Sequence, residues 1–211
     1  MSSEIKETNH LFPVFLKLEE LRVLLIGAGY VGLEKLTAIL NNSPATTVRV
    51  IAKDISKEFM QLASQHSNVH VIQGVYESSC LDDCQVVIAA VNDIALSTII
   101  RNDAKAKGKL INVADKPYLC DFYLGSVVTK GNLKLAISTN GKSPTMAKRL
   151  KEMFAEMLPE ELDDVMNNLH LIRNSLEGNF QDRIKELNKI TQSLVEKPLS
   201  EAEKYEQYWF L

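Results

Sequence analysis

The sequence has few cysteines, no large excess of charge of either sign and no long uncharged apolar run. Three cysteines in 211 residues are too few for a disulfide framework, which predicts a reducing compartment. The 24 basic and 27 acidic side chains give a net charge of -3, which offers no bulk attraction to nucleic acid or to an anionic membrane. No apolar run approaches the roughly 18 residues of a membrane span, and the first residues lack the basic-then-apolar order of a signal peptide. We therefore expect a cytoplasmic protein whose partners include neither a nucleic acid nor a membrane.

Patterns of metal-binding residues are also missing. Cys80 and Cys84 have no second pair of cysteines or histidines nearby, and the four histidines are scattered along the chain. The sequence therefore predicts no dedicated metal site.

What the sequence does contain is a regular alternation of strand-like and helix-like segments in its first half. Strand-like apolar runs begin at residues 22, 47, 69, 86 and 110, and helical spacing follows over 30–40, 55–63 and 94–107. The fourth run is apolar throughout, which is typical of a parallel strand covered on both faces. This order predicts an α/β fold with a Rossmann-like, doubly wound parallel sheet over residues 1–113.

The alternation stops after this sheet. Residues 122–129 and 133–138 are both strand-like and flank a short Lys-Gly-Asn turn, which predicts a hairpin segment over residues 114–143. A two-stranded hairpin is marginal alone, so its apolar residues need a second surface, and we expect a homodimer.

The remaining residues, 144–211, are expected to form a small helical domain. Ser143-Pro144 offers an N-cap followed by proline at the first helical position, and this helix is expected to stop near Pro159. Two apolar stripes with helical spacing follow, and Ser200-Glu-Ala-Glu203 is a capping box for a last short helix.

A glycine-rich loop joins the first predicted strand to the first predicted helix. In Gly27-Ala-Gly-Tyr-Val-Gly32, the first glycine permits a tight turn, Gly29 lets a pyrophosphate approach the backbone, and the last allows close packing of the helix. The backbone of Tyr30 and Val31 lies at the helix N-terminus, where free N–H groups and the helix dipole favour an anion. The loop predicts dinucleotide binding; the alternative is a tight turn without a ligand.

The second strand decides between NAD and NADP less clearly. It ends in Ala-Lys53-Asp54 and lacks an acidic residue at the usual distance of about 20 positions from the loop. Asp54 would suit the ribose hydroxyls of NAD, whereas Lys53 would suit a 2′-phosphate; we expect NAD. The ends of later strands are expected to line the same cofactor through Ala90, Asn92 and Val113.

A second cluster of motifs runs from Asn112 to Pro144, with Asn-Val-Ala-Asp-Lys-Pro over 112–117, Cys-Asp-Phe over 120–122 and Ile-Ser-Thr-Asn-Gly-Lys-Ser-Pro over 137–144. With the glycine loop, these motifs resemble the precorrin-2 dehydrogenase and sirohydrochlorin ferrochelatase family, the amino-terminal half of siroheme synthases. The resemblance covers about residues 9–160. It departs at Gly32, where the family usually has alanine, and at Gly125, where the family usually has proline.

The resemblance implies oxidation of precorrin-2 to sirohydrochlorin with NAD⁺ as hydride acceptor, on the way to siroheme or cobalamin. It also implies that Asp115 is central to catalysis and that the protein dimerises through the hairpin. A carboxylate beside the nicotinamide would accept a proton as the macrocycle is oxidised. If ferrous iron is also a substrate, Asp115 would accept the pyrrole protons, with Asp121 as a weaker candidate. The alternative is that Asp115 only caps a turn before proline.

The substrate carries many carboxylates, so it needs hydrogen-bond donors and positive charge. These are expected on the turn before the helix at Pro144, from Ser138, Thr139, Asn140, Lys142 and Ser143. The alternative is an ordinary capped helix with a solvated basic face.

Two other functions remain open. One is an NAD(P)-dependent oxidoreductase acting on another acidic substrate. The other is a module that senses NAD(H) and contacts a partner through its helices; such a module has no use for Asp115 or for the turn at 138–143.

Overall fold

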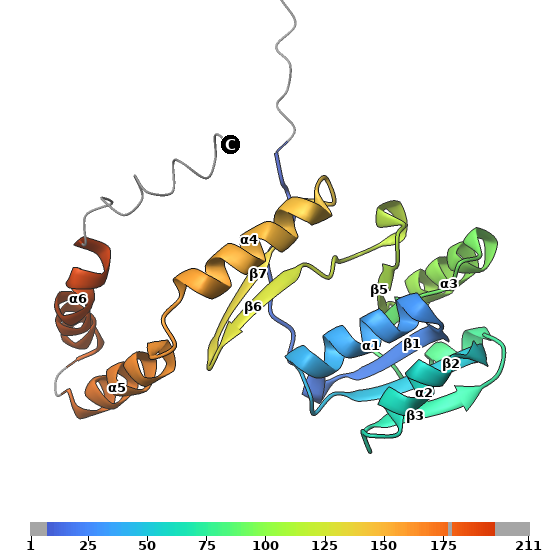
Figure 1. Ribbon diagram of the computed structural model, residues 1–211, viewed down its shortest axis with the longest axis horizontal. Coiled ribbons are helices and arrows are strands. Elements are labelled where there is room, and N and C mark those ends of the chain that lie inside the picture. The colour runs from blue at the N-terminus through green and yellow to red at the C-terminus, as the bar shows by residue number, and fades with distance from the viewer. Residues whose placement is uncertain (1–7, 177–178, 197–211) are drawn as a thin grey trace, which may run out of the picture. The chain divides into compact units, whose positions relative to one another are not determined.

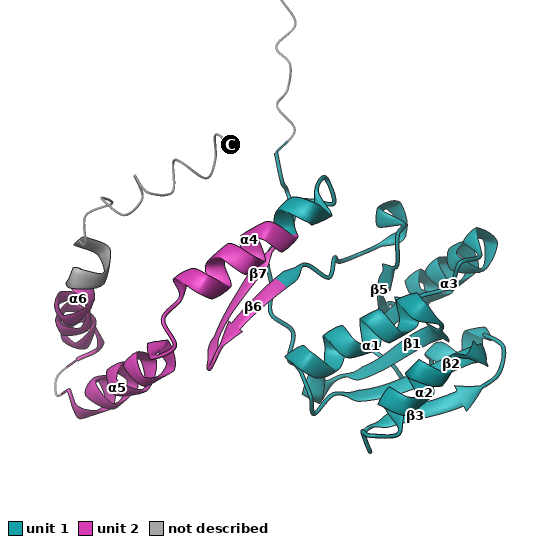
Figure 2. Cartoon of the chain, viewed as in Figure 1, with its two compact units in different colours: residues 1–126, 138–147 teal, residues 127–137, 148–211 magenta. Residues whose placement is uncertain are grey.

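The computed structural model describes residues 8–176 and 179–196, with side chains up to residue 192 (Figure 1). The chain forms two compact units (Figure 2). The first holds the residues up to Ser126 together with Ser138–Ala147, and the second holds Val127–Ile137 together with the chain from Lys148 onward. The segment 114–143 is therefore divided between the two units, with its hairpin in the second.

The first unit is built on a five-stranded sheet in the order β3-β2-β1-β4-β5. Every neighbouring pair is parallel, which confirms the predicted doubly wound sheet. The order reverses between β1 and β4, which makes the carboxyl ends of these two strands the switch point where such sheets bind ligands. The strands are β1 (Arg22–Ala28), β2 (Thr47–Ile55), β3 (Val69–Gln73), β4 (Val86–Ala89) and β5 (Leu110–Val113).

Helices cover both faces of the sheet because successive strand residues are apolar and point to opposite faces. Val23 and Leu25 belong to one buried cluster, with α1 (Tyr30–Asn42) and α2 (Lys57–Ala63). Leu24 and Ile26 belong to a second cluster, with α3 (Ile94–Ala106). This period of two is that of a strand buried on both sides, as the apolar runs predicted. Three short 3-10 helices lie at Leu18–Glu20, Ser78–Leu81 and Pro117–Leu119.

The second unit contains the hairpin, the helical residues 148–157 and the two helices that follow. Its helix α5 (Leu162–Ser175) is joined to the turn of the hairpin by Asp163, whose carboxylate accepts hydrogen bonds from the backbone N (2.7 Å) and the side-chain Nδ2 (2.9 Å) of Asn132. These two donors hold the pKa of Asp163 below its usual value. Lys130 and Glu160 form an ion pair in the same region. The elements are β6 (Ser126–Lys130), β7 (Leu133–Ile137), α4 (Pro144–Met157), α5 (Leu162–Ser175) and α6 (Phe180–Glu196).

The structure corrects two boundaries and confirms others. The helical spacing expected over residues 55–63 begins only at Lys57, because Ile55 is the last residue of β2 and Ser56 caps α2 through the N–H of Phe59 (3.2 Å). The strand expected from residue 122 begins only at Ser126, because the chain before it is bonded to β5. Asp121 donates its N–H to the carbonyl of Ile111 (2.8 Å), and the carbonyl of Phe122 accepts from Nδ2 of Asn112 (2.9 Å). Helix α4 begins at Pro144 and ends before Pro159, as predicted. The capping box at residues 200–203 lies outside the described residues.

Candidate active site

The predicted cofactor residues follow strands that are neighbours in the sheet. The register pairs Ile26 of β1 with Ala89 of β4, and Ala89 with Val113 of β5. Hydrogen bonds continue one residue further, from the N–H of Ala90 to Ile26 (2.7 Å) and from the N–H of Ala114 to Ala89 (2.9 Å). The glycine loop, the segment from Ala90 and the turn at residue 115 therefore leave the same edge of the sheet. This edge is the carboxyl end of the parallel strands.

The three glycines of the loop have different roles. Gly27 has a φ of 103°, and a Cβ there would lie 2.4 Å from the carbonyl oxygen of Ala90. A Cβ on Gly32 would lie 2.3 Å from the carbonyl oxygen of Gly27. A Cβ on Gly29 would meet nothing within 4 Å. Two glycines thus let the loop pack against β4 and α1, and the third leaves backbone open to an approaching group.

The N-terminus of α1 is open for an anion. Gly29 is its N-cap and supplies no side-chain hydrogen bond, and the first turn contains no acidic residue. The first N–H groups of a helix have no partner within the helix, and the dipole makes this end positive. By contrast, α3 is closed by Asp93, whose carboxylate accepts from the N–H of Ala95 (2.7 Å) and of Leu96 (3.1 Å). The α1 terminus therefore fits the pyrophosphate of a dinucleotide.

Strand β2 contains a β-bulge opposite the glycine loop. Its register jumps from Ile51, opposite Ile26, to Ile55, opposite Ala28, so residues 52–54 lie opposite Gly27 alone. The side chains of Lys53 and Asp54 are exposed in this bulge. Both lie where a dinucleotide ribose is bound in this type of fold.

The other predicted cofactor residues differ in their surroundings. Asn92 is exposed and Ala90 is half-buried, both directly after β4. The side chain of Val113 is only 2% exposed and packs in the core, so this placement does not support contact with a cofactor.

Asp115 follows β5 on an exposed turn with unusual backbone geometry. Its φ of 58° lies in the left-handed region, which aspartate tolerates better than most residues. The turn is closed by Lys116, which donates its N–H to the carbonyl of Val113 (3.3 Å) and its Nζ to the carbonyl of Val91 (3.4 Å). The surrounding structure therefore holds the Asp115 backbone in one conformation while its carboxylate faces solvent.

Cys120 lies beneath this turn and was missed as an individual residue by the sequence reasoning. Its sulfur accepts from the N–H of Val113 (3.1 Å) and the Nδ2 of Asn112 (3.6 Å), and lies 3.2 Å from the carbonyl of Val113 and 3.4 Å from that of Lys116. Burial raises the pKa of the Cys120 thiol, so it stays protonated and donates to a carbonyl. The thiol thus ties the two ends of the Asp115 turn together.

Asp121, the weaker candidate for a base, has a structural partner. Both of its carboxylate oxygens bond the guanidinium of Arg101, at 2.9 Å each, and one also accepts from the N–H of Ile111 (3.3 Å). The two side chains are 22% and 14% exposed, respectively. Both oxygens of this carboxylate are therefore occupied by partners within the protein. Asp115 remains the candidate.

The turn at residues 138–143 belongs to the same compact unit as the sheet. Its hydroxyl groups are used within the turn. Ser138 Oγ accepts from the N–H of Asn140 (3.2 Å), Thr139 Oγ1 accepts from the N–H of Ser143 (3.2 Å), and Ser143 Oγ caps α4 through the N–H of Met146 (3.2 Å). Asn140 has a φ of 54°, and Lys142 is exposed. The three hydroxyls shape the turn, and Asn140 and Lys142 are the side chains suited to reach a ligand.

The described residues contain neither a cluster of metal ligands nor a membrane-spanning helix. Among them, no group of three or more His, Cys, Asp or Glu side chains could hold a metal ion. None of the described helices is long and apolar enough to cross a membrane.

Comparisons with known proteins agree with this geometry. A family model described as "Putative NAD(P)-binding" matches residues 14–126, and one for the central part of a sirohaem biosynthesis protein matches residues 130–157. A siroheme synthase of Psychrobacter cryohalolentis is 35% identical over 149 residues, which are 71% of this chain and 28% of the relative. Siroheme synthase 2 of Cronobacter sakazakii is 32% identical over 168 residues, 80% of this chain and 36% of the relative. The chain thus spans about a third of the curated relatives that it matches. Among solved structures, SirC, a precorrin-2 dehydrogenase, shares the fold with a TM-score of 0.69 and 20% identity, covering 93% of this chain and 98% of that one.

Proposed function

Because this chain belongs to the family of NAD(P)-binding proteins that includes the siroheme synthases, we propose that it oxidises precorrin-2 to sirohydrochlorin with NAD⁺ as the oxidant. One observation carries the proposal. The open N-terminus of α1 at Gly29 and the exposed carboxylate of Asp115 leave the same edge of the sheet, on strands separated only by β4. The first suits a dinucleotide and the second suits proton transfer beside it.

Backbone groups would make most of the contacts that hold the cofactor. The N–H groups of Tyr30, Val31 and Gly32 would donate to the pyrophosphate, and Asp54 in the β2 bulge would accept from the ribose hydroxyls. When bound, the nicotinamide accepts a hydride. Asn92, exposed after β4, would contact this half of the cofactor. We propose NAD over NADP because an acid is available in the bulge for the hydroxyls.

Asp115 would accept the proton released when the macrocycle loses a hydride. The balanced reaction is precorrin-2 plus NAD⁺ giving sirohydrochlorin, NADH and a proton, so a base is needed at the reacting carbon or at a ring nitrogen. The hydrogen bonds of the turn hold the backbone of Asp115, and the exposure of its side chain would let a macrocycle reach the carboxylate. A module that only senses NAD(H) would have no use for this carboxylate.

The carboxylates of the substrate would bind the turn before α4. Asn140 and Lys142 would supply an amide donor and a positive charge, and Ser138, Thr139 and Ser143 would keep the turn in shape through the hydrogen bonds described above.

We extend the proposal to a homodimer formed through the hairpin. The side chains of Leu133, Leu135 and Ile137 are only half-buried within the single chain, and a second surface would complete their burial.

The three cysteines are free thiols, in keeping with a reducing cytoplasm. If ferrous iron is a second substrate, the macrocycle supplies four nitrogen ligands and Asp115 would accept the pyrrole protons.

The experiment compares two aspartate variants in an assay of precorrin-2 oxidation followed by the absorbance of sirohydrochlorin. Asp115→Asn should lower turnover at least about a hundredfold, as expected for loss of a positioned base, and leave the Kd for NAD⁺ unchanged. Asp83→Asn is the matched control, because Asp83 is also exposed but precedes β4, at the opposite edge of the sheet. Turnover by Asp115→Asn at the parental rate would overturn the catalytic assignment.

A further inference from the structure

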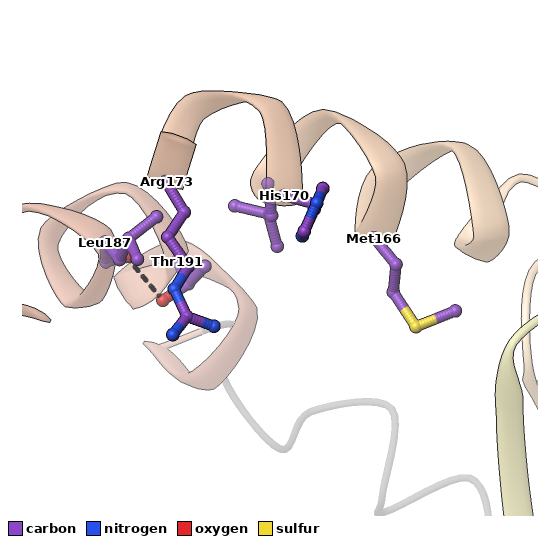
Figure 3. A pocket seen from close by; sticks show the side chains of 6 residues that line it. Met166, His170, Arg173, Leu187 and Thr191 are labelled. Atoms are coloured by element: carbon purple, nitrogen blue, oxygen red, sulfur yellow. Dashed lines mark hydrogen bonds between the residues drawn. The ribbon is translucent and has the colours of Figure 1, made fainter. Parts of the chain in front are cut away.

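A groove lies between α5 and α6, in the unit that carries none of the residues assigned to the site above (Figure 3). Its volume is about 280 Å³, just below the roughly 300–1,000 Å³ typical of pockets for whole ligands. A space of this size suits one or two large side chains. The lining residues are Met166, Leu169, His170, Arg173, Leu187 and Thr191.

The polar atoms of the groove are largely satisfied already. Nε2 of His170 is 3.0 Å from Nδ2 of Asn174, and the hydroxyl of Thr191 donates to the carbonyl of Leu187 (2.8 Å). Arg173 supplies a positive charge, and its side chain extends toward Thr191 across the groove (Figure 3). Small-molecule sites need several convergent polar groups, and this lining does not offer them. The groove offers an apolar surface beside the positive charge of Arg173.

The sequence after α6 has the matching chemistry. It contains Tyr205, Tyr208 and Trp209, which have the i, i+3, i+4 spacing of one helical face, and the capping box at residues 200–203 predicts where such a helix starts. Pro198 interrupts the continuation of α6, so the chain is expected to change direction there. Three glutamates in this stretch would complement Arg173. We propose that residues 201–211 dock their aromatic face in the α5–α6 groove of the same chain.

The lengths allow this return. Helix α6 ends at Glu196, only five residues after Thr191 in the groove, and the four residues 197–200 reach about 13 Å when extended. A helix over residues 201–211 would be about 16 Å long. The lining from Met166 to Arg173 covers about 10 Å of α5, so the helix is long enough to cover it.

The test uses Trp209, the only tryptophan in the chain. Its fluorescence in the full chain should be shifted to shorter wavelength than that of N-acetyl-tryptophanamide, and it should be protected from acrylamide quenching. Leu169→Glu, in the groove, should shift the emission to longer wavelength and remove the protection. Leu171→Glu is the matched control, because Leu171 is on the same helix but 65% exposed and outside the groove. It should leave the emission unchanged.

Three results would overturn the proposal. The first is parental Trp209 emission equal to that of the free fluorophore. The second is an unchanged emission in Leu169→Glu; if that variant fails to fold by circular dichroism, the exposed Arg173→Glu serves instead, and an unchanged emission there counts equally. The third is loss of the short-wavelength emission on dilution, which would assign the groove to a second copy of the chain. None of these outcomes depends on the proposed oxidation of precorrin-2.

Discussion

Alanine substitutions in the glycine loop should separate protein stability from cofactor binding. Gly32→Ala is the informative change, because it introduces the residue that the resembled family usually has at this position. In this chain the new Cβ would lie 2.3 Å from the carbonyl oxygen of Gly27, whereas ordinary contact begins at 3.4 Å. The loop or the helix must therefore move by about 3.4 − 2.3 = 1.1 Å. Gly29→Ala makes no such demand, because its Cβ would enter open space.

The expected effects follow from these contacts. Overpacking of a close contact costs about 1–3 kcal/mol, so Gly32→Ala should lower the free energy of unfolding by that amount. For a protein of this size this corresponds to a fall in Tm of about 2–4 °C for each kcal/mol. Gly29→Ala should leave Tm unchanged, but its methyl group occupies the approach to the pyrophosphate. It should weaken NAD⁺ binding at least about tenfold, or about 1.4 kcal/mol.

The assays are thermal unfolding without cofactor and calorimetric titration with NAD⁺, on the parent and both variants. The reasoning predicts opposite rankings in the two measurements: Gly32→Ala is the less stable protein, and Gly29→Ala is the folded protein with impaired binding. If Gly32→Ala unfolds at the parental temperature, the approach of α1 to Gly27 is not a tight constraint. If Gly29→Ala binds NAD⁺ with parental affinity, the pyrophosphate does not lie over this residue.

Three further predictions concern other parts of the site and fold. Cys120→Ala should reduce kcat about tenfold to a hundredfold with the Kd for NAD⁺ unchanged, because the Asp115 turn loses its tie, while the buried Cys84→Ala should retain the parental kcat. Asp54→Ala should weaken NAD⁺ binding, measured by calorimetry, and equal affinities in variant and parent would remove it from the ribose site. Asp163→Ala should lower Tm at neutral pH. Because hydrogen bonds hold the pKa of Asp163 below its usual value, the difference in Tm should persist down to about pH 4 and disappear as the pH falls through the folded pKa. A difference in Tm that persists in acid would contradict the role of the carboxylate.

The sheet and the glycine loop were predictable from sequence because their signals are local. Uniformly apolar runs such as that of β4 indicate parallel strands buried on both sides. The glycine spacing from Gly27 to Gly32 indicates dinucleotide binding only where it joins a strand to a helix, and the flanking sequence shows both. The start of α4 was equally local, since Ser143 caps it directly before a proline.

The features that sequence reasoning missed depend on residues brought together by the fold. Asp121 has the same side chain as Asp115, and only its ion pair with Arg101, twenty positions earlier, separates the structural carboxylate from the candidate base. Cys120 acts on a turn four to seven residues before it. The strand expected from residue 122 starts late because that residue is bonded to β5, which its own apolar sequence does not reveal.

The most direct test of the proposed activity is the stoichiometry of NADH and sirohydrochlorin. The purified protein would be mixed anaerobically with NAD⁺ and enzymatically generated precorrin-2, and both products would be followed by absorbance in the same sample. The proposal predicts one NADH for each sirohydrochlorin and no sirohydrochlorin when NAD⁺ is omitted. Formation of sirohydrochlorin without NADH, or no oxidation in a sample whose protein has bound NAD⁺, would contradict it.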